Sequence, residues 1–136
     1  MSRAFPITIY HNPNCGTSRN TLAMIEAAGY APVVVEYCKN GWTRPQLERL
    51  LEDMGSTARE IMRAKGTPAE ELGLTDPAAS DAAIVAAMLK HPILVNRPIV
   101  VTPLGTKLCR PSEVVLGLLE QQPASFTKED GEVVKP

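Results

Sequence analysis

A strand-helix-strand pattern occupies the start of the chain and constrains the fold more than any other feature. Residues 7–10 form a short apolar run, and turn-forming residues follow at 11–16. A helical pattern comes next, with Thr17 or Ser18 as the expected cap, before a second β-branched run at 33–36. Because a crossover through one helix returns the chain in the same direction, we expect the two strands to be parallel and the second to be buried.

The middle of the chain carries helical signals and no strand signals. Two capping-box patterns each precede an apolar helical stretch, and a third helical pattern ends before a proline. The expected capping residues are Thr43 with Gln46, Thr57 with Glu60, and Ser80 or Asp81. We therefore predict a helical insertion at about 43–90.

The last third of the chain returns to strand patterns. Residues 99–102 and 106–109 are expected to pair as a hairpin around the turn Pro103-Leu104-Gly105. An apolar helical pattern follows Pro111, a residue suited to a first helical position. The polar, Pro- and Gly-punctuated end predicts a loose tail at about 122–136.

This order of elements predicts the fold class. A β-α-β unit, then helices, then β-β-α is typical of an α/β, thioredoxin-like three-layer fold. Its β-sheet is mixed, and here a helical insertion would separate strands 2 and 3. With 136 residues the chain is long enough for one domain, so we expect a single domain over 1–136.

Composition argues against several classes of partner. A net charge of −1 gives no electrostatic reason to expect nucleic acid or an anionic membrane. The apolar runs are too short to span a bilayer, and the N-terminus lacks a signal-peptide pattern. We therefore expect a cytoplasmic protein. Its three cysteines form no close pair, which predicts neither a disulfide framework nor a metal site.

Cys15 is the strongest candidate for chemistry because it lies where the first strand gives way to a helix. Free backbone N–H groups and the helix dipole stabilise a thiolate there, and they can also cradle an oxyanion. A thioredoxin-type dithiol would have a second cysteine at position 18, where this chain has Ser18. The alternative is an inert thiol, which is how we interpret Cys38 and Cys109.

His11 and Ser18 are candidate partners of Cys15. An imidazolium at His11, four residues earlier, would stabilise the thiolate, although a loop histidine often bonds only the backbone. The Ser18 hydroxyl could cap the helix or donate a hydrogen bond to the sulfur.

Three arginines are candidates for binding an oxyanion near Cys15. Arg97 precedes Pro98, which in a thioredoxin-type fold is often a cis proline beside the active site. Arg110 follows the predicted hairpin, and Arg63 lies on the helical insertion. Each alone could be a solvated surface charge, but three together would make a strong anion site.

Three sequence blocks resemble a known family. They are YHNPNCGTSRNTL at 10–22, HPILVNRPIVV at 91–101 and TPLGTKLCRPSE at 102–113. From about residue 7 to 119 the chain resembles the arsenate reductases of the glutathione- and glutaredoxin-coupled ArsC family, within the thioredoxin-like superfamily.

The resemblance implies arsenic detoxification with no tightly bound cofactor. Cys15 would attack arsenate, while His11 lowers the pKa of this cysteine. Glutathione would act as co-substrate, and glutaredoxin would remove it from the enzyme. The residues that fall on the family's anion-binding arginines are Arg63, Arg97 and Arg110.

Other functions of related chains fit the sequence less well. Spx-type regulators, which bind RNA polymerase, sense redox state through a Cys-x-x-Cys pair that Ser18 interrupts. A thiol protein acting on glutathione conjugates would not need three arginines. Arsenate reductases that resemble low-molecular-weight phosphatases have an arginine six positions after the cysteine, where this chain has Thr21.

Overall fold

The computed structural model describes residues 5–135, which fall into two compact units. We call residues 5–36 with 97–135 the thiol unit, because it contains Cys15. Residues 37–96 form the helical unit. The single domain expected over residues 1–136 stays a prediction.

The thiol unit is built on a four-stranded mixed sheet. Its strands are β1 (Thr8–His11), β2 (Val33–Glu36), β3 (Ile99–Thr102) and β4 (Gly105–Leu108), in the order β2-β1-β3-β4. The first two strands are parallel, as expected, whereas β1 with β3 and β3 with β4 are antiparallel. This mixed α/β sheet confirms the predicted thioredoxin-like fold class.

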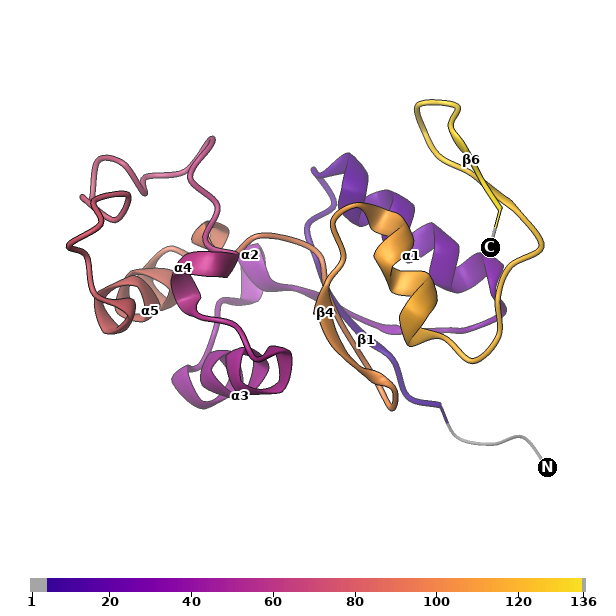
Figure 1. Ribbon diagram of the computed structural model, residues 1–136, viewed down its shortest axis with the longest axis horizontal. Helices are drawn as coiled ribbons and strands as arrows, with labels where there is room; N and C mark the ends of the chain where they lie inside the picture. The colour runs from indigo at the N-terminus through magenta and orange to yellow at the C-terminus, as the bar shows by residue number, and fades with distance from the viewer. Residues whose placement is uncertain (1–4, 136) are drawn as a thin grey trace. The chain divides into compact units, whose positions relative to one another are not determined.

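One face of the sheet is covered by α1 (Gly16–Ala27) and the 3₁₀ helix η2 (Ser112–Leu118). The two helices lie side by side, η2 being the orange helix next to α1 in Figure 1. Strand alternation turns Ile7 and Ile9 toward these helices, while Thr8 between them faces the other way. The buried core they share contains Ile7, Ile9, Met24, Ile25, Ala28, Val100, Cys109, Val115, Leu118, Leu119 and Val134.

The prediction that the second strand is buried is wrong. Val33 is 62% exposed and Val34 is 42% exposed. Strand β2 lies at the edge of the sheet and pairs only with β1. A β-branched run indicates a strand, but it does not reveal whether that strand has neighbours on one side or two.

The helical unit, residues 37–96, includes the whole range of the predicted insertion at about 43–90. Its elements are α2 (Tyr37–Asn40), α3 (Arg44–Met54), α4 (Ala58–Ile61), α5 (Asp81–Lys90) and the 3₁₀ helix η1 (Pro92–Leu94). Both predicted capping boxes, at Thr43 and Thr57, are present, and the Ser80 hydroxyl caps α5. The unit begins at residue 37, earlier than expected, and Met62 and Val95 form an isolated antiparallel bridge within it.

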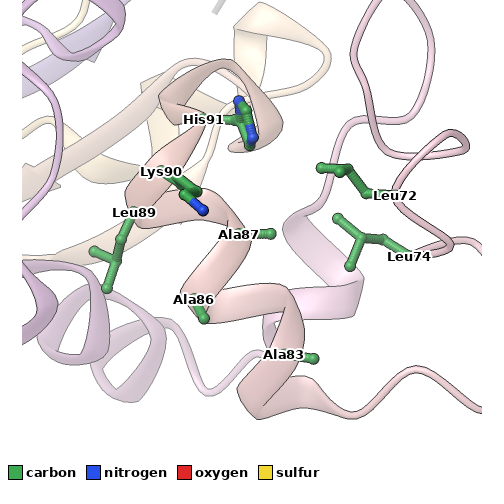
Figure 2. Close-up of a pocket in the computed structure, with 8 residues that line it drawn as sticks. All are labelled: Leu72, Leu74, Ala83, Ala86, Ala87, Leu89, Lys90 and His91. Atoms are coloured by element: carbon green, nitrogen blue, oxygen red, sulfur yellow. The ribbon is translucent and has the colours of Figure 1, made fainter.

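An apolar groove of about 700 Å³ runs along α5 in the helical unit. In Figure 2, Leu72 and Leu74 face Ala83 and Ala87 across it, and His91 lies at the end of the helix. Leucine and alanine side chains make up most of this lining, and the residues that line the groove include no cysteine. Among residues 5–135, no helix is both long and apolar enough to cross a membrane.

Residues 126–134 contain a small hairpin, in the segment where the sequence suggested a loose tail. Phe126–Thr127 (β5) pairs antiparallel with Val133–Val134 (β6) as a small hairpin. Val134 joins the core of the thiol unit, and Phe126 packs against that core. A few apolar contacts therefore hold a segment whose composition is mostly polar.

Replacing Ile9 by Ala should destabilise the protein far more than replacing Val33. Ile9 is fully buried, so truncation leaves a cavity and should lower the free energy of unfolding by about 2–5 kcal/mol. Val33→Ala, on the neighbouring exposed edge strand, is the matched control and should cost less than about 1 kcal/mol. Urea denaturation followed by circular dichroism measures both changes, and equal losses would contradict this packing.

Candidate active site

Cys15 lies between the end of β1 and the first turn of α1. After His11 the chain makes a tight turn, in which the Cys15 N–H donates to the Asn12 carbonyl at 3.0 Å. The Asn14 N–H donates to the Asn12 side-chain oxygen at 2.9 Å. Cys15 itself is the N-cap residue, and no side-chain hydrogen bond caps the helix. The expectation of a cap at Thr17 or Ser18 is therefore wrong.

The pKa of Cys15 is lowered from an ordinary value of 9.0 to about 7. Burial alone would raise it, because a thiolate loses hydration when only 8% of the residue is exposed. The backbone N–H of Ser18 and the guanidinium groups of Arg97 and Arg110 more than offset this cost. The Arg110 Nη1 lies 3.7 Å from the Cys15 sulfur.

The register of the β3–β4 hairpin explains why two distant arginines meet at this thiol. Ile99 pairs with Leu108, and the Cys109 N–H donates to the Pro98 carbonyl at 2.8 Å. Arg97 and Arg110 are the next residues outward on the two arms, and the Arg110 Nη1 donates to the Arg97 carbonyl at 3.0 Å.

Arg97 is buried, whereas Arg110 is exposed. The Arg97–Pro98 peptide bond is cis, as the thioredoxin-type topology suggested, and so is Arg110–Pro111. Together the two guanidinium groups give the thiol a positively charged surrounding that suits an oxyanion.

His11 contacts Ser18 in this structure. Its Nδ1 lies 2.6 Å from the Ser18 hydroxyl oxygen, which also accepts a hydrogen bond from the Asn12 N–H at 3.1 Å. Burial lowers the pKa of His11, with Glu36 opposing and Arg19 assisting this shift. A neutral imidazole is therefore favoured at pH 7, and it contacts the hydroxyl of Ser18, whose backbone amide faces the Cys15 sulfur.

Arg63 belongs to the helical unit. Its N–H donates to the Leu94 carbonyl at 2.7 Å, and its Nε donates to the Lys65 carbonyl at 3.0 Å. The thiol unit brings Cys15 together with His11, Ser18, Arg97, Pro98 and Arg110. The anion-binding role of Arg63 stays a prediction.

Arg19, which is not among the site residues predicted from the sequence, lies close to the site. It donates to the Pro13 carbonyl at 2.8 Å, in the turn before Cys15, and forms an ion pair with Glu129. The hydrogen bond that Arg19 donates to Glu129 is the main cause that raises the pKa of Arg19, and the charge of Cys15 adds to it. The sequence did contain a signal for this proximity, because Arg19 follows Cys15 by four residues, which is about one helical turn.

The other two cysteines are in different environments. Burial raises the pKa of the Cys109 thiol to about 12, so it stays protonated in the core. Cys38 is exposed on α2, and Cys15, Cys38 and Cys109 are not joined in disulfides. No group of three or more metal-ligating side chains occurs in the part of the chain that the structure describes.

Comparisons with known proteins agree with this architecture. The model of the ArsC family matches residues 10–118. The chain is 60% identical to the arsenate reductase of Rhizobium meliloti (strain 1021) over 129 residues, which are 94% of this chain and 92% of that protein. An arsenate reductase of Escherichia coli is 57% identical over the same shares.

A solved structure shows the same fold. The arsenate reductase from Vibrio cholerae matches with a TM-score of 0.81 and 42% identity, covering 86% of this chain and all of that one. The fold and the site therefore define a class of protein, namely thioredoxin-like proteins with a single activated thiol at the start of the first helix. The chain belongs to the ArsC family.

The lowered pKa of Cys15 predicts a pH profile for its alkylation. Iodoacetamide reacts with the thiolate, so the rate at Cys15 should fall as the pH drops through about 7. Arg110→Gln removes a stabilising charge and should move the midpoint upward, toward 9.0. Peptide mass spectrometry separates Cys15 from the exposed Cys38, which serves as the internal reference. A midpoint near pH 9 in the unaltered protein would contradict the activation of Cys15.

Proposed function

We propose that this protein reduces arsenate to arsenite, with Cys15 as the nucleophile. The carrying observation is a single thiol with a pKa of about 7, held beside Arg97 and Arg110. Near neutral pH about half of such a thiol is ionised, so the attacking species is abundant without a separate base. The arsenate reductase names of the relatives at 55–60% identity support the choice of substrate.

The two arginines suit an arsenate oxyanion. Arsenate is tetrahedral and negatively charged near neutral pH, and guanidinium groups bind such oxygens through paired N–H donors. Arg110 spans the space between the Arg97 carbonyl and the Cys15 sulfur, so its charge lies where the anion must approach. Arg63 would complete the set of three arginines that the family resemblance implies.

The reaction balances with one protein thiol and one external thiol. The Cys15 thiolate attacks arsenic, and an arsenate oxygen leaves as water after taking up protons. Glutathione then supplies the second sulfur, and two electrons pass from the two sulfurs to arsenic. The products are arsenite and a disulfide between Cys15 and glutathione.

An external thiol must then restore Cys15. Position 18, where a dithiol enzyme would carry its resolving cysteine, is a serine bonded to His11. We therefore propose that glutaredoxin attacks the glutathione sulfur and releases the Cys15 thiolate. Glutathione and glutaredoxin are supplied by a reducing cytoplasm, which is where we place the protein.

His11 acts on Cys15 through Ser18 in this proposal. The imidazole and the Asn12 N–H both hold the Ser18 hydroxyl and thereby fix the first turn of α1. That turn presents the Ser18 backbone N–H to the sulfur, which lowers the pKa of Cys15. His11 is then a positioning residue that favours the thiolate without carrying a charge.

Turnover should depend on Cys15 and on the coupled system of glutathione, glutaredoxin and glutathione reductase. With glutathione, glutaredoxin and glutathione reductase present, arsenate should drive NADPH oxidation, because each cycle consumes two electrons. Cys15→Ser should abolish this rate, whereas Cys38→Ser, the exposed-thiol control, should retain it. Arsenate-dependent oxidation that survives Cys15→Ser would refute the assignment.

Loss of a site arginine should weaken arsenate binding. Arg97→Ala and Arg110→Ala should each raise the KM for arsenate by roughly tenfold or more, since a charged hydrogen bond contributes about 1.5–3 kcal/mol. Arg63→Ala should behave likewise if this residue completes the anion site. Arg49→Ala, an exposed arginine paired with Asp53, is the control and should leave the KM unchanged. An unchanged KM in both Arg97→Ala and Arg110→Ala would remove the anion site.

A further inference from the structure

Glu129 lies between β5 and β6 and meets the start of α1 through two different groups. Its carboxylate accepts hydrogen bonds from the Arg19 Nε at 2.8 Å and the Arg19 Nη2 at 2.9 Å. Its backbone N–H donates to the Asn20 side-chain oxygen at 3.0 Å. Neighbouring residues of α1 thus hold a carboxylate and a peptide N–H that belong to one residue.

This arrangement lies next to the reactive thiol. A Cβ atom built on Gly16, the residue after Cys15, would lie 3.7 Å from both the Arg19 Nη2 and a Glu129 carboxylate oxygen. Arg19 also donates to the Pro13 carbonyl at 2.8 Å, in the turn before Cys15. A peptide joined to the Cys15 sulfur is therefore close to the groups that hold Glu129.

The ion pair between Arg19 and Glu129 is exposed, so another ligand can replace Glu129. The Arg19 and Glu129 side chains remain 44% and 49% exposed, and exposed ion pairs contribute little to stability. The hairpin has separate anchors, because Lys128 pairs with Glu113 at 2.6 Å and Val134 is in the core. Glu129 can leave Arg19 without release of the hairpin.

We propose that Arg19 and Asn20 form a subsite for a carboxylate and a peptide N–H of glutathione, which Glu129 occupies in the free protein. The paired N–H groups of Arg19 match a carboxylate, and the Asn20 side-chain oxygen matches a peptide N–H. Glutathione carries both groups. This inference rests on the proposed function, to which it adds a binding position for glutathione beside Cys15. The Glu129 carboxylate and glutathione then compete for Arg19.

The test compares two disulfides and requires no arsenate. The Cys15 thiolate attacks one sulfur of oxidised glutathione, whose S–S bond breaks. The mixed disulfide forms, and the other glutathione leaves as a thiolate that takes a proton from solvent. Bis(2-hydroxyethyl) disulfide reacts in the same way but lacks carboxylates and peptide groups. In a Cys38→Ser background, mass spectrometry gives both rates at Cys15, and their ratio cancels changes in thiolate reactivity.

Glu129→Gln should raise the rate ratio, glutathione disulfide over the neutral disulfide, about two- to fivefold, because it weakens the internal competitor. Arg19→Ala should lower this ratio about tenfold, because it removes the paired N–H donors. The double variant should match Arg19→Ala, since the competitor then has nothing to occupy. Glu132→Gln, a tail carboxylate paired with Lys128, is the control and should leave the ratio unchanged.

One result would overturn the subsite, namely an unchanged rate ratio in both Glu129→Gln and Arg19→Ala. If both rates then change by the same factor, Glu129 acts only through the charge of the thiolate. The ratio does not depend on arsenate turnover, so failure of the subsite and failure of the proposed reductase activity are distinguishable.

Discussion

Burial and ionisation oppose each other at Cys15, and the rest of the thiol unit supplies the groups that decide between them. A buried thiolate loses hydration, which by itself raises its pKa. The Ser18 backbone N–H and the guanidinium groups of Arg97 and Arg110 replace that hydration and lower the pKa to about 7. The protein thus keeps a reactive anion in a site that excludes most water.

Each compensating group reaches the sulfur through a different part of the fold. The Ser18 amide is there because Cys15 is the N-cap of α1, and the arginines are there because the β3–β4 register places them opposite each other. His11 extends this support one step outward, through its contact with the Ser18 hydroxyl. Electrostatics at one atom therefore depends on a helix start, a hairpin register and a turn.

The β5–β6 hairpin adds a further contact near the site. Arg19 bridges the turn before Cys15 and the tip of the hairpin, joining segments more than a hundred residues apart. Because the Lys128–Glu113 pair and Val134 also hold this hairpin, the Arg19–Glu129 ion pair is not its sole anchor. A surface ion pair gains significance here from its place beside a nucleophile.

The sequence by itself determined the β-α-β start, the capping boxes of the helical insertion, the hairpin and the candidate thiol, because these depend on local periodicity and turn chemistry. Sequence patterns missed features that depend on neighbours far along the chain. They placed Val33 and Val34 in a buried strand, suggested a loose tail and did not single out Arg19. Only the tertiary structure decided that β2 is an edge, that Ser18 acts through its amide and that Glu129 meets Arg19. Register and long-range pairing set these contacts, and local patterns do not encode either.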